Sequence, residues 1–264
     1  MAPASRSLGG EGIRIYDGYI KTVSASGAGI GSGKTSSGSG GSITISDSTV
    51  TAVSPKNGAG IGTGDQSGVS LGAVTISHST VTATGGAEAA GIGTGNESTV
   101  KAFNIEIKDH SIVTATGGEY GAGIGGGEDG DGDAFLVSGR STVEAVAGSD
   151  GWGKAVGYGD FNVFSVPSTG SVSISNGLRV KAGKSSDNTE DYVADDRFDA
   201  IRNYKYAKIY PCGHERAALK YHDYSAHGKY CADCKEWVYD SYEDHIWTTI
   251  MYAPSAAERL RWRR

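Results

Sequence analysis

The chain has 264 residues, a formal net charge of −6 and 42 glycines, roughly twice the average glycine share of ~7%. No stretch approaches the ~18 consecutive apolar residues of a membrane span, and the acidic balance argues against a nucleic-acid-binding surface over the whole chain. The first ten residues lack the apolar core of a signal peptide, so we expect a cytosolic protein or a mature or trimmed chain.

A repeat of about 31 residues organises the glycine-rich part of the chain, because all but two glycines precede residue 184. The string Ala-Gly-Ile-Gly-x-Gly, or a degraded copy of it, begins at Ala28, Ala59, Ala90, Ala122 and Ala155. Two short segments in which apolar and polar residues alternate precede each copy, as in Ile43–Ile45 and Val50–Ala52. Alternation with β-branched residues predicts strands rather than helices.

Each repeat is predicted to form one coil of three short strands, stacked on its neighbours at about 4.8 Å because a single coil cannot bury its own apolar face. The predicted fold is an all-β, right-handed parallel β-helix (β-solenoid) of about five to six coils, the last one partial and ending at Leu178–Ala182. A sandwich, a propeller and a disordered linker are the alternatives. The inward columns are expected to be Ile15, Ile45, Ile76, Ile107, Val137 and Ile174; Ile20, Val50, Val81, Val113 and Val143; and Ile30, Ile61, Ile92 and Ile124.

The repeat string Val-Thr-Ile-x-x-Ser-x-Val-Thr-Ala-Thr-Gly-Gly-x-x-x-Ala-Gly-Ile-Gly-x-Gly, which ends here at Gly95, resembles repeats in large surface and secreted proteins of gut-type Gram-positive bacteria. Those proteins are often labelled carbohydrate-binding-domain-containing. The resemblance implies a non-catalytic module outside a bacterial cell or on its surface, with a glycan or a cell-surface protein as partner. Residues 178–211 are similar to the segment that closes such arrays, so we expect the first domain over residues 11–211.

The segment Ala28–Thr35 is close to a nucleotide-binding Walker A motif. A Walker loop must lead into a helix whose amides cradle phosphate, but the next six residues here are only Ser and Gly. The same turn also recurs in the later repeats without Lys34. The repeat therefore explains the match, and we expect no nucleotide.

Three aspartates at alternate positions, Asp129, Asp131 and Asp133, resemble the start of a calcium-binding loop. The twelfth position from Asp129 is Arg140 instead of the glutamate that such a loop requires. A solvated turn between coils is the preferred interpretation, and a weak calcium site is the alternative.

Outward threonines such as Thr51, Thr82 and Thr114 are expected in columns, a pattern that is typical of ice-binding faces. Ile112 and Glu144 interrupt these columns, and β-propensity alone favours threonine at such positions. A polysaccharide lyase or hydrolase is a further alternative, because β-helices include such enzymes. The acidic residues of the repeat are scattered, however, so no catalytic residue is assigned.

The strongest chemical signal follows the repeat, in a small module predicted over residues 212–247. Cys212 and His214 form a Cys-x-His pair, and Cys231 and Cys234 form a Cys-x-x-Cys turn. Together they predict a tetrahedral, structural zinc site. The alternative nitrogen ligands are His222, His227 and His245.

A disulfide with one thiol left over, or three reduced thiols, are the other interpretations of these cysteines. Residues 248–264 are expected to form a tail, with a short helix after the capping box that begins at Ser255.

Overall fold

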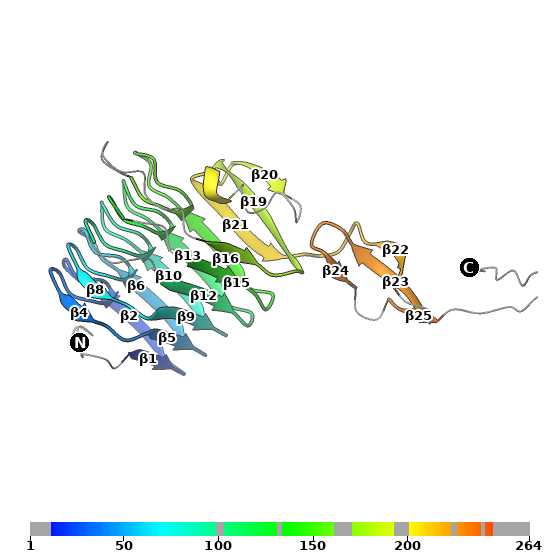
Figure 1. The fold of residues 1–264 in the computed structure, drawn as a ribbon, viewed down its shortest axis with the longest axis horizontal. Coiled ribbons are helices and arrows are strands. Elements are labelled where there is room, and N and C mark those ends of the chain that lie inside the picture. The colour runs from blue at the N-terminus through cyan, green and yellow to red at the C-terminus, as the bar shows by residue number, and fades with distance from the viewer. Residues whose placement is uncertain are drawn as a thin grey trace, which may run out of the picture. The chain divides into compact units, whose positions relative to one another are not determined.

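The computed structural model describes residues 12–98, 103–130, 134–160, 171–192, 201–222, 226–238 and 241–244. The chain separates into two compact units, Met1–Cys212 and Gly213–Arg264. The first unit is a β-solenoid, in which strands from successive repeats lie side by side (Figure 1). The second unit is called the C-terminal module below. The predicted helix after Ser255 lies outside the described residues.

Three sheets of stacked strands form the solenoid. Sheet 1 contains β1 (Ile13–Tyr16), β5 (Ile43–Ser46), β9 (Ala73–Ser77), β12 (Asn104–Lys108), β15 (Ala134–Val137) and β18 (Val172–Ile174). Sheet 2 begins with β2 (Tyr19–Val23), β6 (Thr49–Val53), β10 (Thr80–Thr84), β13 (Ile112–Thr116) and β16 (Thr142–Val146). Sheet 3 contains β3 (Ile30–Gly31), β7 (Ile61–Gly62), β11 (Ile92–Gly93), β14 (Ile124–Gly125) and β17 (Val156–Gly157). Strands β4 (Ser37–Ser39) and β8 (Gly68–Ser70) form a separate two-stranded parallel sheet.

The coils stack in strict repeat register, which confirms the predicted parallel arrangement. Ile45 pairs with Ile76, and Val81 pairs with Val113, so equivalent side chains stand above one another. The three predicted columns are buried, except that Ile20 in the first coil is half-buried. Two further columns fill the interior: Ile43, Val74, Ile105 and Phe135; and Ala52, Ala83, Ala115 and Ala145.

A ladder of serine hydroxyls supports the turn between sheets 1 and 2. The turn uses a left-handed residue, such as Asp47 (φ 49°) or His78 (φ 45°), followed by a buried serine. The hydroxyl of Ser79 accepts a hydrogen bond from the N–H of Ser48 at 3.1 Å and donates to the Ser77 carbonyl at 2.7 Å. Buried backbone groups need such partners, so the serines connect one coil to the next.

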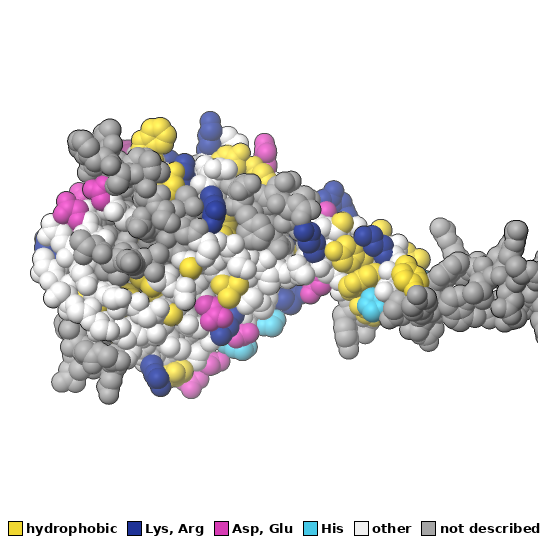
Figure 2. All heavy atoms as spheres, viewed as in Figure 1, with side chains coloured by type: hydrophobic (Ala, Val, Ile, Leu, Met, Phe, Trp, Pro, Cys, Tyr) yellow, Lys and Arg dark blue, Asp and Glu magenta, His cyan; other side chains and the backbone are white. Residues whose placement is uncertain are grey.

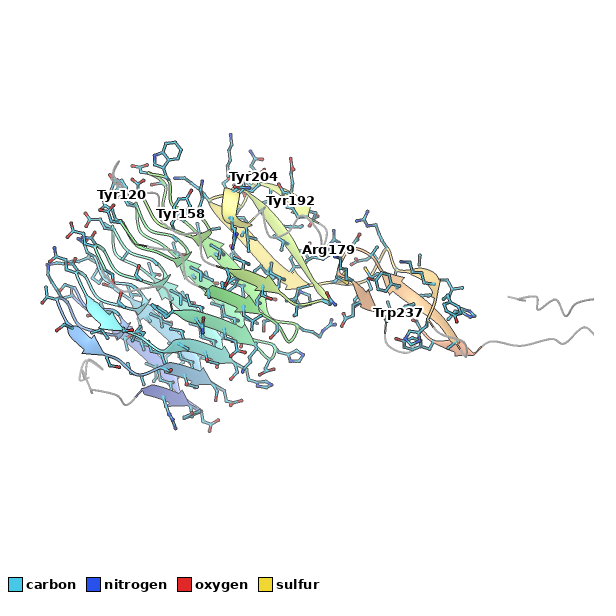
Figure 3. The ribbon with its side chains drawn as sticks, viewed as in Figure 1. Tyr120, Tyr158, Arg179, Tyr192, Tyr204 and Trp237 are labelled. Atoms are coloured by element: carbon cyan, nitrogen blue, oxygen red, sulfur yellow. The ribbon has the colours of Figure 1, made fainter. Side chains whose placement is uncertain are left out.

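The closing segment departs from the predicted partial sixth coil. Its first strand, β18, does pair in parallel with β15, but β19 (Leu178–Ser185) does not pair with β16. Instead β21 (Tyr206–Pro211) lies antiparallel between them, and β20 (Asn188–Tyr192) pairs with β19 on its other edge. Tyr192 and Tyr204 meet in this cap, with their hydroxyls 3.1 Å apart (Figure 3). A further parallel coil would end in another unpaired sheet edge. The antiparallel strands instead cover the edge of the last coil.

The C-terminal module is a small antiparallel sheet. It contains β22 (Ala218–Tyr221), β23 (Ala226–Cys231), β24 (Glu236–Trp237) and β25 (Glu243–Asp244). Strand β23 pairs with each of the other three. The aromatic ring of Trp237 contacts that of Tyr230, with ring centroids 5.1 Å apart.

Candidate metal centre

Two turns of the chain supply the four residues that were predicted to bind metal. Cys212 directly follows β21, and its backbone N–H donates to the Gly177 carbonyl at 2.8 Å. His214 has a φ of 59°, and its carbonyl accepts a hydrogen bond from the N–H of Ala217 at 3.0 Å. The Cys231–Cys234 turn joins β23 to β24. Each turn therefore presents two candidate ligand side chains, with one residue between Cys212 and His214 and two residues between Cys231 and Cys234.

The structure brings these four side chains into one cluster. One ligand atom from each, the sulfur of each cysteine and a ring nitrogen of His214, lies within 4.8 Å of all the others. Cys234 Sγ is 3.4 Å from His214 Nδ1. The cysteines, all of which the structure describes, are buried and form no disulfide. The result is a Cys₃His group that could hold a metal ion, with the donor set of structural zinc sites.

An arginine holds the Cys-x-x-Cys turn in place. Asp233 lies between the two cysteines of this turn and is only 8% exposed. It accepts two hydrogen bonds from Arg216, at 2.8 Å from Nε and 2.7 Å from Nη2. Such a bidentate pair fixes orientation as well as distance. Sequence reasoning missed both residues, because a lone Arg and a lone Asp carry no metal-binding signature.

The alternative histidine ligands lie elsewhere or outside the described residues. The ring of His222 makes edge contacts with Trp237 and Tyr242, at centroid separations of 4.7 and 4.8 Å. His227 lies in β23 and is not part of the Cys₃His group. His245 lies outside the described residues. Among the described histidines, His214 is the one that joins the three thiols.

The Walker-like segment lacks the structure of a phosphate-binding loop. After the turn at Lys34 the chain enters the short strand β4 and not a helix. The Nζ of Lys34 is 2.6 Å from Oδ2 of Asp65, which occupies the equivalent place in the next coil. A phosphate loop needs the free amides of a helix N-terminus, so this lysine has a structural role between coils.

The candidate calcium loop is described only at its first residue. Asp129 has a φ of 57°. Asp131 and Asp133 lie outside the described residues. Burial and the nearby carboxylate of Glu88 raise the pKa of Glu128. A weak calcium site here stays an untested alternative to the solvated turn.

The predicted threonine columns lie on the outer face of sheet 2. Strand pairing aligns Thr51, Thr82, Thr114 and Glu144 in one row, and Thr49, Thr80, Ile112 and Thr142 in another. All of these side chains are exposed or half-buried, and Ile112 is 54% exposed. The interruptions at Ile112 and Glu144 therefore reach the surface, and ice binding stays an untested alternative.

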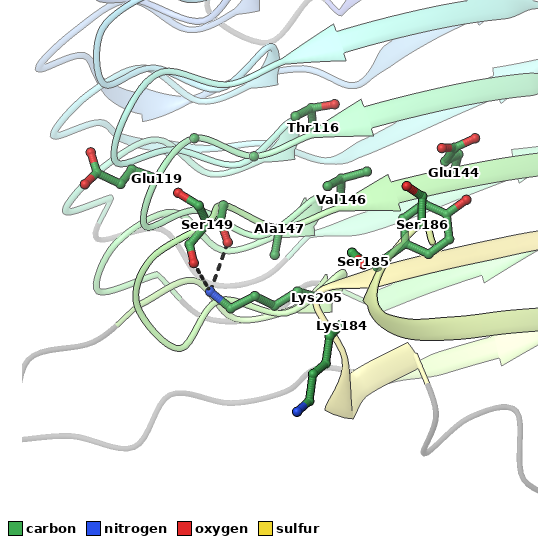
Figure 4. Close-up of a pocket in the computed structure, with 14 residues that line it drawn as sticks. Thr116, Glu119, Glu144, Val146, Ala147, Ser149, Lys184, Ser185, Ser186 and Lys205 are labelled. Atoms are coloured by element: carbon green, nitrogen blue, oxygen red, sulfur yellow. Dashed lines mark hydrogen bonds between the residues drawn. The ribbon is translucent and has the colours of Figure 1, made fainter. Parts of the chain in front are cut away.

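A cleft of about 650 Å³ opens where the last coils meet the closing strands (Figure 4). Its lining includes carboxylates, lysines and hydroxyls. The carboxylate of Glu144 is 3.8 Å from the ammonium of Lys208. Burial and this same carboxylate raise the pKa of Tyr206 to about 12. The carboxylate of Glu144 therefore interacts with two residues of the closing strand β21, Tyr206 and Lys208.

Lys205 lines the cleft and forms hydrogen bonds with the turn at residues 148–150. Its Nζ donates to the carbonyls of Gly148, Ser149 and Asp150 at 3.0, 2.8 and 2.9 Å, and Figure 4 draws the bonds to Gly148 and Ser149. Lys205→Met keeps the apolar stem but leaves three carbonyls without this donor. We expect it to lower the free energy of unfolding by about 1.5 kcal/mol, as for hydrogen bonds to a charged group near the surface.

Lys184→Met is the matched control for this prediction, because Lys184 lines the same cleft and is exposed. Its substitution should change the free energy of unfolding by less than about 0.5 kcal/mol. Urea unfolding of the full chain measures both values. An equal loss in the two variants would show that charge in the cleft, and not the three hydrogen bonds, is what stabilises the cap.

Comparison with known proteins supports the repeat architecture. Residues 13–34, 43–65, 74–96 and 105–128 match the Beta helix repeat family, one match for each of the first four coils. Searches among curated proteins and solved structures gave no match. The described part of the chain contains no helix with the length and apolar character of a membrane span. The repeat region is therefore a β-solenoid, and the C-terminal module carries a Cys/His cluster.

Proposed function

We propose that the chain is a non-catalytic, extracellular or cell-surface module of a bacterium. In this proposal the solenoid is a rigid scaffold, and the C-terminal module is held together by a structural zinc ion. The observation that carries the zinc assignment is the convergence of three buried thiols and one imidazole within 4.8 Å. Four protein ligands leave no open coordination position, which favours a structural role over a catalytic one.

Packing and charge support the scaffold role. The solenoid interior is filled by stacked aliphatic columns with exposures near zero, which makes a dense and stiff core. Where Figure 2 draws described residues of the solenoid, the surface is mostly backbone and uncharged polar side chains, with scattered charges. The extracellular location and a glycan or cell-surface protein as partner come from the resemblance of the repeat. Turnover of polysaccharides by the full chain would overturn the non-catalytic assignment.

The zinc assignment predicts the metal content of the purified protein. We expect about one zinc per chain when the full chain is isolated without added metal or chelator, as measured by mass spectrometry of dissolved metals. His214→Ala should reduce zinc retention, whereas His222→Ala and His227→Ala should retain it. An absence of zinc together with a Cys–Cys crosslink in the intact chain would contradict the assignment.

A further inference from the structure

The imidazole of His214 has a different kind of group at each of its two nitrogens. Nδ1 is 3.4 Å from the sulfur of Cys234, on the side of the thiol cluster. Nε2 is 3.5 Å from Oε2 of Glu236. The ring therefore lies between the ligand cluster and a carboxylate.

The carboxylate of Glu236 comes from the same hairpin that supplies two of the thiols. Lys235 turns the chain with a φ of 58°, and β24 begins at Glu236, which pairs with Cys231 in β23. This register brings the side chain back beside the cluster, two residues after Cys234. Oε2 is a buried atom for which the described residues provide no hydrogen bond. A buried carboxylate oxygen without a donor is costly, so a donor is expected to complete this site.

The chemistry of a metal-binding imidazole supplies that donor. A neutral imidazole that gives its Nδ1 lone pair to a metal must carry its proton on Nε2. Metal-binding histidines commonly donate this second N–H to a carboxylate, which fixes the tautomer and the ring orientation. In this chain Oε2 of Glu236 lies 3.5 Å from Nε2 of His214, so its carboxylate is placed to accept that N–H.

We propose that Glu236 is a positioning residue of the metal centre. Its carboxylate accepts a hydrogen bond from Nε2–H of His214 and thereby directs Nδ1 toward the metal. The inference rests on the proposed structural zinc site, and it adds a residue that binds no metal itself. It also names His214 Nδ1, rather than Nε2, as the ligand atom.

The test is the zinc affinity of the full chain, measured by competition with a chromophoric chelator. Glu236→Ala should weaken zinc binding about 10- to 100-fold, the usual effect of losing such a partner. Glu236→Gln keeps an acceptor oxygen and should recover most of the affinity. Glu215→Ala is the matched control, because it removes an equal charge next to His214 and should change the affinity about twofold or less.

A second background separates positioning from a general effect of charge. In His214→Cys the fourth ligand is a thiolate that has no second nitrogen to orient. Adding Glu236→Ala to that variant should change zinc affinity about twofold or less. The absorption spectrum of the cobalt-substituted chain gives a second readout, because a misoriented imidazole changes its d–d bands in Glu236→Ala but not in Glu215→Ala.

The outcomes distinguish this inference from the proposed function. If the parent chain binds zinc and Glu236→Ala binds it equally well, Glu236 does not position His214. An equal loss in the parent and His214→Cys backgrounds would also overturn the inference, because it would show a charge effect that does not act through the imidazole. If the parent chain binds no zinc, the proposed zinc site itself fails.

Discussion

Removing zinc from the full chain with a chelator is expected to unfold the C-terminal module and to leave the solenoid folded. Among the described residues of this module, the buried hydrophobic side chains are those of Cys231 and Cys234. Strand β22 is exposed along its whole length. The module therefore has little apolar core apart from its proposed ligands, and a small fold of this kind needs a staple.

Approximate free energies indicate that the metal, and not the aromatic contacts, stabilises the folded module. The rings of His222, Tyr230, Trp237 and Tyr242 form four close pairs, worth roughly 2–6 kcal/mol in total at ~0.5–1.5 kcal/mol each. Ordering the chain costs ~1.5 kcal/mol per residue, so ring contacts alone fall short. Zinc bound to small Cys/His folds contributes about 10–16 kcal/mol. We therefore expect the C-terminal module to unfold when zinc is removed, and not merely to become slightly less stable.

Hydrogen exchange followed by mass spectrometry measures this effect in each unit. Peptides within residues 213–238 should lose protection after chelation and regain it when zinc is restored. Peptides from β5 to β16 should not change, because their core is made of aliphatic columns. Cys231→Ser should behave like the chelated parent chain. Full protection of the module after verified metal removal would show that the aromatic cluster suffices to fold it.

The solenoid could be predicted in detail because its physics is local and repeated. An isoleucine at the same place in every repeat can be buried only if equivalent residues stack, and the register Ile61 to Ile92 confirms this. Alternation of period two then determines which side chains point inward. The ladder of buried serines, such as Ser79 and Ser111, was not predicted, since serine near a turn is usual on the surface as well.

The closing strands and the ligand histidine were harder to derive. Strand β21 reaches its place beside β16 from more than 50 residues away, and an antiparallel partner leaves no mark in a parallel repeat. For the metal centre, spacing identified the cysteines and His214 but could not exclude His222 or His227. Glu236 carried no signal at all, because its position depends on a left-handed turn at Lys235 and on the pairing of β24 with β23.

Gly62→Ala is expected to cause a large loss of stability in the solenoid. Gly62 lies in sheet 3 with a φ of +137°, and a Cβ built there would be 1.8 Å from the carbonyl oxygen of Gly93 in the next coil. That oxygen accepts the N–H of Thr63 at 3.0 Å. The coils cannot stay in register with such an overlap, so this hydrogen bond and the packing around it must be lost.

Gly38→Ala isolates the contribution of backbone conformation from that of close approach. Gly38 also has a positive φ, +111°, but a Cβ there would meet no atom within 4 Å. It should therefore lose about 1–3 kcal/mol, the cost of a strained residue. Gly62→Ala should lose more than about 4 kcal/mol, a large share of the ~5–15 kcal/mol that a domain has. Urea unfolding of the full chain compares the two variants. Equal losses would mean that positive φ alone, and not the approach of neighbouring coils, requires glycine in sheet 3.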